Sequence, residues 1–303
     1  MNCEETIEVQ SDSYLIDPDE LKKRIAGAGD LIMLPTVAVE AMELANDPDC
    51  SIPAFVQVIE TDTSLVTDIL SLSNSSVYGA KAQINSVQHA VVCIGTTQCQ
   101  NLIVSSCVKA LSRNLPPSVE WSRDVLWQHN LQTATIARHV NKALKLGFEG
   151  EEFSGAMIHD VGRIIIAAAA PDVFEAVDRL SFSENARILE HEQSLIGTDH
   201  CEVGAIFAET SGLPEALADV IRFHHHPEDA TSNSDLVHLI AVADDMANHL
   251  MFAGEAAGYD ATINSNLEVL LGASANPVDA EKLATEAMQA AEKAVENTAK
   301  VDA

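Results

Sequence analysis

Apolar residues in this sequence recur at intervals of three and four positions, and this spacing constrains the fold more than any other feature. Leu65, Ile69 and Leu72 would share one face of a helix. A second stripe, near the end of the chain, consists of Leu283, Ala287, Ala290 and Ala294. Strand-like alternation is scarce, and aromatic residues make up only 4% of the chain, so Ala, Leu, Ile and Val must supply the core. We therefore expect an all-α protein in which each helix buries one apolar stripe.

The 303 residues, 47% of them hydrophobic, are enough to build a full core without disulfides. The double proline Pro116-Pro117 cannot lie inside a helix and predicts a boundary between two helical subdomains. Asp279 is placed to cap a final helix, which would either dock on the body or bind a partner helix. The predicted organisation is a flexible lead-in over residues 1–18, an N-terminal helical subdomain over 19–117, a second helical subdomain over 118–253 and a C-terminal helical extension over 254–303.

The chain is strongly acidic, with 17 Lys and Arg against 46 Asp and Glu and a formal net charge of −29. Such a surface repels the phosphates of nucleic acids and anionic lipid headgroups. We therefore expect no nucleic-acid partner and no membrane partner.

The compartment is predicted from three further features. The start of the sequence is acidic and lacks the basic and apolar regions of a secretory signal, and no run of eighteen apolar residues follows. The six cysteines show no CxxC spacing, which indicates reduced thiols in apolar surroundings. These features predict a cytoplasmic protein.

A His159-Asp160 pair interrupts an otherwise apolar stretch between Ser154 and Arg163. Burying a carboxylate costs several kcal/mol (about 3–5 when the charge is left unpaired) unless a partner or a cation compensates it. The pair alone leaves two interpretations open: a metal site, or a satisfied pair in which His159 donates to a backbone carbonyl and Asp160 caps the turn at Gly162.

Other His and Asp residues lie at positions where helices are expected to face the core. His200 opens one predicted helix, a tandem His pair ends another, and Asp244 points inward from a third. His129 belongs to a long helix over residues 121–144, and we expect it near the rim of the buried stripe. The complete candidate set is His129, His159, Asp160, His200, His224, His225 and Asp244. Mixed imidazole and carboxylate ligation suits one or two divalent transition-metal ions, namely Fe, Mn, Zn or Ni. The remaining alternative is that these groups satisfy one another by hydrogen bonds.

The chain resembles the HDOD domain, an HD-related output domain of bacterial signalling proteins that is helical throughout. The matching residues, in order, are Leu34-Pro35, Asp62, Leu70, Asn74-Ser75, Tyr78-Gly79, Ile84, Ala90 and Ile94-Gly95, and the resemblance runs from about residue 34 to residue 253. The order of the His and Asp residues is also similar to that of HD-superfamily phosphohydrolases, especially the HD-GYP branch. This resemblance implies that His129, His159, Asp160 and Asp244 form the HD tetrad. It implies that the extra ligands of a dinuclear site are His200, His224 and His225, with His226 outside the pattern.

Two departures from the catalytic branch bear on function. Arg163 stands where that branch has a lysine, and residues 227–231 replace its Gly-Tyr-Pro motif. The first functional prediction is therefore a signal-transduction module with an HD-type metal site that acts by binding or scaffolding, with a signalling protein as partner of the N-terminal helices. The alternative is a metal-dependent phosphohydrolase (phosphodiesterase) in which Asp160 and Arg163 are catalytic and the substrate is a phosphate-containing small molecule.

Overall fold

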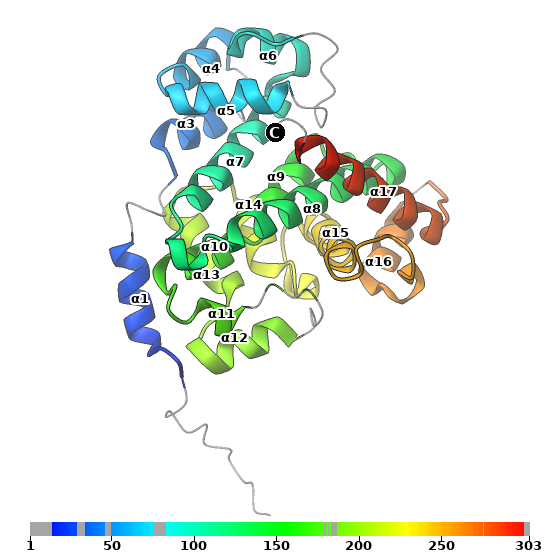
Figure 1. The fold of residues 1–303 in the computed structure, drawn as a ribbon. Coiled ribbons are helices and arrows are strands. Elements are labelled where there is room, and N and C mark those ends of the chain that lie inside the picture. The colour runs from blue at the N-terminus through cyan, green and yellow to red at the C-terminus, as the bar shows by residue number, and fades with distance from the viewer. Residues whose placement is uncertain are drawn as a thin grey trace, which may run out of the picture.

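The computed structural model describes residues 14–28, 34–45, 50–74, 83–178, 180, 182, 187–274 and 276–299. Within these ranges every regular element is an α-helix or a short 3-10 helix (Figure 1). The predicted all-α fold is therefore confirmed. The predicted lead-in lies outside the described residues up to residue 13.

The first part of the chain supplies α1 (Pro18–Gly27), α3 (Thr36–Ala45), α4 (Ile52–Ile59), α5 (Thr63–Ser73), α6 (Val87–Ile94) and α7 (Thr96–Arg113). Helices α3 to α6 form one end of the molecule, at the top of Figure 1, and α7 runs from them into the body, whereas α1 lies apart from them beside the second half of the chain. Two of these helices begin at serine caps. Ser51 accepts a hydrogen bond from the Ala54 amide at 3.3 Å, and Ser86 accepts one from the His89 amide at 3.0 Å. The helix α6 ends at Gly95, whose φ of 85° favours glycine.

Asn74 has a structural role at the end of α5. Its side-chain amide donates to the carbonyl of Leu70 at 2.7 Å and to that of Ile84 at 2.8 Å, and its oxygen accepts from the Ile84 amide at 2.8 Å. These bonds join the two sides of residues 75–82, which lie outside the described residues and include Tyr78. Asn74 therefore acts as a turn residue, as its sequence context indicates.

The second half of the chain supplies the helices that carry the predicted ligands. They are η1 (Pro117–Val119), α8 (Ser122–Leu144), α9 (Glu151–Ile158), α10 (Val161–Ala169), α11 (Phe174–Val177), α12 (Ile188–Ile196), α13 (His200–Thr210), α14 (Glu215–Phe223), η3 (Pro227–Asp229), α15 (Ser234–Ala253), η4 (Ala261–Ile263), α16 (Ser265–Ala273) and α17 (Ala280–Ala299). Helix α8 packs against α9, α15 and α17, and α13 packs against α10 and α14. Helix α7 contacts helices on both sides of Pro116, so the predicted boundary there stays a prediction.

The final helix docks on the body, as one of the two sequence alternatives predicts. Asp279 accepts a hydrogen bond from the Lys282 amide at 2.8 Å and so caps α17. Leu283, Ala287 and Met288 on this helix are buried against the long helix α8. Small side chains on one face let the two helices approach closely.

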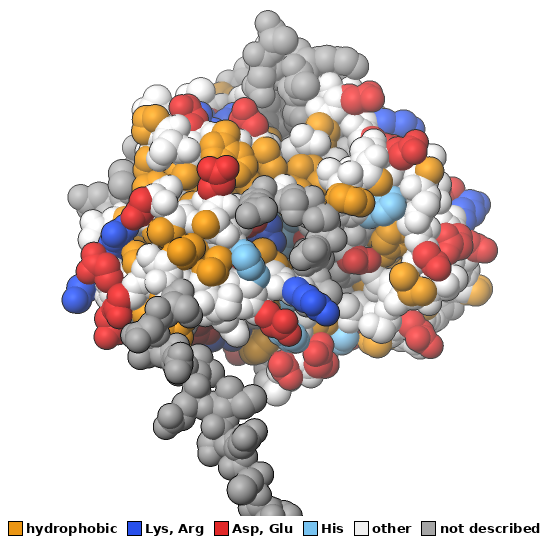
Figure 2. Space-filling view, turned by 60° about the horizontal axis from the view of Figure 1, so that its bottom comes forward, with side chains coloured by type: hydrophobic (Ala, Val, Ile, Leu, Met, Phe, Trp, Pro, Cys, Tyr) orange, Lys and Arg blue, Asp and Glu red, His pale blue; other side chains and the backbone are white. Residues whose placement is uncertain are grey.

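The surface agrees with the charge of the sequence. On the face shown in Figure 2, acidic side chains are spread widely and fewer basic ones lie between them. Among the described helices none is long and apolar enough to cross a bilayer.

Candidate metal centre

All seven predicted residues come together where six helices meet. His129 lies in α8, His159 and Asp160 form the junction between α9 and α10, His200 is the first residue of α13, His224 and His225 directly follow α14, and Asp244 lies in α15. The His-Asp pair therefore breaks one apolar stretch into two helices, so that the two side chains project from a turn into the core.

His129, His159, Asp160 and Asp244 form the first half of the cluster. The Nε2 atom of His129 lies 3.0 Å from Asp244 Oδ1 and 3.5 Å from Asp160 Oδ2. The Nε2 atom of His159 lies 3.5 Å from each of the same two oxygens. Nitrogen and oxygen ligands around one transition-metal ion stand about 3.0–3.4 Å apart, because each lies about 2.1 Å from the ion. The spacing of these four atoms is therefore close to that of a ligand set.

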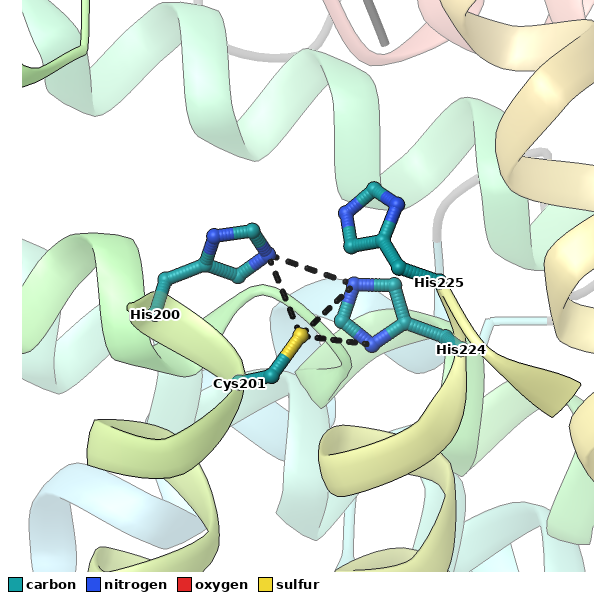
Figure 3. A group of neighbouring side chains, drawn as sticks. All are labelled: His200, Cys201, His224 and His225. Carbon is teal, nitrogen blue, oxygen red and sulfur yellow. Dashed lines mark hydrogen bonds between the residues drawn. The ribbon is translucent and has the colours of Figure 1, made fainter. Parts of the chain in front are cut away.

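His200 and His224 form the second half, and Asp160 belongs to both. The Nε2 atoms of the two imidazoles face each other at 3.4 Å. Asp160 Oδ1 lies 3.4 Å from Nε2 of His200 and 3.6 Å from that of His224. Asp160 thus directs one oxygen into each half, which is the arrangement of a carboxylate that bridges two cations. Figure 3 shows His225 beside His224, and the two ring centroids are 4.3 Å apart.

The second ring nitrogen of three of these imidazoles is held outside the cluster. Nδ1 of His159 lies 2.7 Å from a backbone carbonyl of the preceding turn, and Nδ1 of His224 lies 3.1 Å from two such carbonyls. Nδ1 of His200 lies 2.8 Å from the carboxylate of Glu192. Because carbonyls and carboxylates accept hydrogen bonds, each Nδ1 carries a proton, and in the neutral ring each Nε2 presents a lone pair to the cluster.

Several buried atoms of the cluster have no hydrogen-bond partner among the described residues. They are both ring nitrogens of His129, Nε2 of His159 and of His225, and both carboxylate oxygens of Asp160. The rings of His129 and His159 are fully buried, and Asp160 is 1% exposed. Buried polar atoms in proteins are rarely left unpaired. The donor set, imidazole nitrogens with carboxylate oxygens, fits a divalent transition metal.

The pKa values of the cluster favour ionised carboxylates. Burial alone would raise the pKa of Asp160, but the Arg163 guanidinium and neighbouring imidazoles hold it well below its usual range. Burial likewise acts against ionisation of Asp244, whose pKa is nevertheless held well below its usual range by His129 and His159. Burial lowers the pKa of His129 itself and keeps that ring neutral. Burial alone would lower the pKa of His200 and His224, but Glu192 and Cys201 raise that of His200 well above its usual range, and Cys201 and Asp160 raise that of His224 to about 10. Metals bind ionised carboxylates and neutral imidazoles, so a metal ion would displace protons from these two rings.

Two expectations from the sequence are wrong in detail. His129 is not at the rim of the buried stripe, because its ring is fully buried while Trp127 is only partly so. Asp160 does not cap α10 with its side chain. The same interpretation also predicted that His159 donates to a backbone carbonyl. That bond is present, and it orients the ring toward the cluster.

Arg163 lies beside the cluster but is engaged by acidic side chains. Its Nε atom is 3.2 Å from Asp160 Oδ1 and 3.6 Å from Asp178 Oδ2. The residue is only 4% exposed. Its guanidinium therefore compensates buried carboxylates.

Three neighbours of the cluster were not singled out by the sequence. Glu192 is fully buried and accepts hydrogen bonds from both the backbone amide and Nδ1 of His200, each at 2.8 Å. Cys201 lies within 3.6 Å of the His200 ring, and the ring of Phe182 stacks on that of His129 with centroids 5.0 Å apart. Adjacency to His200 was a usable signal for Cys201, whereas nothing in the sequence separates Glu192 from the exposed Glu190.

Similar proteins share the fold. The chain is 27% identical over 218 residues to an uncharacterized protein of Treponema pallidum (strain Nichols), a match that covers 71% of this chain and 41% of the relative. The chain thus spans less than half the length of that relative.

Solved structures are similar over most of the chain. An HDOD domain protein from Geobacter sulfurreducens matches with a TM-score of 0.75 and 24% identity, covering 94% of this chain and 97% of that one. A candidate phosphohydrolase from Shewanella amazonensis SB2B matches with a TM-score of 0.66 and 22% identity, covering 91% and 97%. A candidate metal-dependent phosphohydrolase from the same organism matches with a TM-score of 0.54 and 17% identity, covering 90% and 99%. At these identities the similarity shows a common helical fold.

The family follows from the sequence match. The model of the HDOD domain family matches residues 31–227, more than half of the chain. That range includes the N-terminal motif residues and six of the seven clustered side chains, all but Asp244. The chain belongs to the HDOD domain family.

Proposed function

We propose that this protein is a bacterial regulatory module whose His and Asp cluster holds one or two divalent transition-metal ions in a structural or sensory role. Its N-terminal helices would bind a signalling protein in the cytoplasm. The ligands are His129, His159, Asp160, His200, His224, His225 and Asp244.

The metal assignment rests on one observation: several hydrogen-bond acceptors face one another in the core. The Nε2 lone pairs of His159, His200 and His224 face the oxygens of Asp160 and Asp244. When the rings are neutral and the carboxylates ionised, none of these atoms carries a hydrogen that it could donate to another. Acceptors at 3.4–3.6 Å repel one another unless a cation lies between them. A metal ion supplies that charge, and so would protons on the rings, which is the alternative that the experiment must separate.

Burial supports a regulatory role over hydrolysis. His129, His159 and His200 are fully buried, and His224 is 2% exposed. Arg163, the residue that would steady a phosphate, is occupied by Asp160 and Asp178. A substrate would have to displace these contacts before it reached the ligands.

The proposed partner surface lies on the N-terminal helices. Ile52 on α4 is 42% exposed and Val92 on α6 is 70% exposed, and these two helices pack against each other. Exposed apolar side chains on neighbouring helices are suited to a protein partner.

The second candidate is a phosphohydrolase, which is favoured by the bridging position of Asp160. Bound metal ions would supply electrostatic stabilisation of charge on a phosphate-containing substrate. In that case Asp160 would orient both halves of the site, and Arg163 would have to exchange a carboxylate for the phosphate.

Elemental analysis of the full chain, purified without an affinity tag or chelator, tests the metal. We expect close to one or two transition-metal ions per chain, and loss of them in Asp160→Ala. Metal-free protein with an intact fold would contradict the proposal. The metal-loaded protein is then assayed against phosphate monoesters, diesters and cyclic dinucleotides. Absence of turnover agrees with a regulatory module, whereas robust turnover that Asp160→Ala abolishes would establish the phosphohydrolase instead.

A further inference from the structure

Cys201 places its sulfur inside the second half of the cluster. The Sγ atom lies 3.6 Å from Nε2 of His200 and 3.9 Å from Nε2 of His224. Figure 3 shows the thiol pointing toward these two rings, and the ring of His225 lies next to both, with its centroid 5.1 Å from that of His200 and 4.3 Å from that of His224. Cys201 is buried, with 4% of its surface exposed.

These atoms have the spacing of a tetrahedral ligand set. With a metal–nitrogen distance of about 2.1 Å and a metal–sulfur distance of about 2.3 Å, tetrahedral angles place nitrogens about 3.4 Å apart and sulfur about 3.6 Å from nitrogen. The structure gives 3.4 Å between the Nε2 atoms of His200 and His224, and 3.6 and 3.9 Å from each of them to Cys201 Sγ. Three atoms thus form one face of a tetrahedron.

A carboxylate oxygen lies close to both imidazoles. Asp160 Oδ1 lies 3.4 Å from Nε2 of His200 and 3.6 Å from Nε2 of His224. It is buried and has no hydrogen-bond partner among the described residues. Its ion pair is with Arg163, whose Nε atom lies 3.2 Å away, and the two ring nitrogens on its other side leave room for a cation between them and the oxygen.

A simple thiol hydrogen bond accounts for less of this geometry. A thiol carries one hydrogen, but the Sγ of Cys201 faces ring nitrogens of both His200 and His224. A hydrogen bond from the thiol to one ring would leave the Nε2 lone pair of the other ring without a donor.

We propose that Cys201 is a metal ligand, and that the second cation is held by His200, Cys201, His224 and Asp160 Oδ1. This inference rests on the proposed function, which places metal in the cluster, and adds a thiolate to a site of imidazoles and carboxylates. The ligand atom of His225 lies within 4.8 Å of those of His200, Cys201 and His224, so this imidazole stands beside the same position.

The thiolate has two consequences. Soft sulfur ligation favours zinc or iron at this position over manganese. Four protein ligands also occupy every coordination position of a tetrahedral ion. Such closed sites are structural, whereas catalytic sites keep one position open. The second position is therefore closed to substrate, in agreement with the regulatory role.

X-ray absorption of the zinc-loaded full chain is the first test. We expect one sulfur per chain at about 2.3 Å from zinc, which is half a sulfur per zinc when two ions are bound. Zinc bound by nitrogen and oxygen alone would overturn the inference and leave the proposed function standing. Failure to bind zinc or any other transition metal would overturn both. This measurement uses the natural sequence, so it does not depend on the folding of a variant.

Cobalt substitution assigns the sulfur to its residue. We expect the near-ultraviolet sulfur-to-cobalt charge-transfer band in the natural protein and its loss in Cys201→Ser and Cys201→Ala, with bound metal reduced by one ion per chain. Cys107→Ala is the matched control, because Cys107 is equally buried on α7, away from the cluster. A band that survives in Cys201→Ser, or disappears in Cys107→Ala, would contradict the assignment.

Discussion

A single buried carboxylate outside the predicted set holds His200 in place. Glu192 accepts bonds from the backbone amide and from Nδ1 of His200, both at 2.8 Å, and so fixes the ring that faces the second position. Carboxylates that orient a metal-binding imidazole contribute to affinity although they never touch the ion. The role of Glu192 is therefore one of positioning.

We expect Glu192→Gln to weaken metal binding at the second position by about 10–100-fold, because the neutral amide is a poorer acceptor and lowers the basicity of the His200 ring. Titration with a competing chelator measures this change. The first position, at His129 and His159, should keep its affinity. Glu190→Gln, on the exposed side of the same helix, is the control. Equal loss at both positions would indicate general damage to the fold instead.

Glu152, at the start of α9, gives a pH-dependent prediction away from the cluster. Burial raises the pKa of this carboxyl, although it accepts a bond from the Gly150 amide at 2.8 Å. Between the unfolded-state pKa, about 4.3, and the raised native pKa, the native state binds more protons than the unfolded state. The contribution of Glu152 to stability therefore falls as pH rises through that window and is constant above it.

The replacement Glu152→Gln removes this titration. We expect the free energy of unfolding of the variant, relative to the natural protein, to increase from pH 4 to pH 7. Urea unfolding at several pH values measures it. Glu151→Gln, at the exposed neighbouring position, controls for the loss of one negative charge. A difference that stays flat or decreases with pH would show that burial does not dominate at Glu152.

Among the helices, α10 and α13 approach so closely that only glycine fits between them. A Cβ atom on Gly162 would run into the carbonyl group of His200, whereas one on Gly155 would meet side chains of Val220 and Ile240 at ordinary contact distances of 3.4 Å or more. The backbone of His200 cannot yield without moving the ring that belongs to the cluster.

We expect Gly162→Ala to destabilise the protein by about 1–3 kcal/mol, the usual range for overpacking, and to weaken metal binding at His200. Gly155→Ala is the matched control on the preceding helix. It should be neutral or stabilising by up to about 1 kcal/mol, because alanine favours helices over glycine. Chemical unfolding of the two variants tests the contrast, and equal stabilities would refute it.

Helices and their caps were predictable from local sequence, because Ser51, Ser86 and Asp279 act on amides only a few residues away. The identity of the clustered residues was also predictable, since a His-Asp pair in an apolar stretch is conspicuous. Which of these side chains face one another was not predictable. The two oxygens of Asp160 face different groups, and the burial of His129 depends on α15 and on Phe182, which are distant in sequence. Such contacts arise only when the helices pack.

For the whole molecule, the position of the cluster predicts where metal would stabilise the fold. The proposed ligands come from α8, α13, α14, α15 and the junction of α9 and α10, so two ions that share Asp160 would together link five separate segments of the chain. Helices α4 and α6 supply none of them. An ion that binds only the native state stabilises it by about 2.7 kcal/mol at a free concentration 100 times its Kd.

Removal of metal by a chelator should therefore lower Tm by about 5 °C or more, since 1 kcal/mol shifts Tm by about 2–4 °C in a domain of this size. Amide hydrogen exchange locates the effect. We expect lost protection in α8, α13, α14 and α15, because uncompensated acceptors of Asp160 and Asp244 then repel the facing rings, while α4 and α6 keep their protection. Readdition of zinc should restore both measurements. Unchanged exchange in α13 and α14 after complete removal of metal would mean that hydrogen bonds and protons alone hold the cluster together, and the charge balance of the core would then rest on Arg163 and the protonated rings.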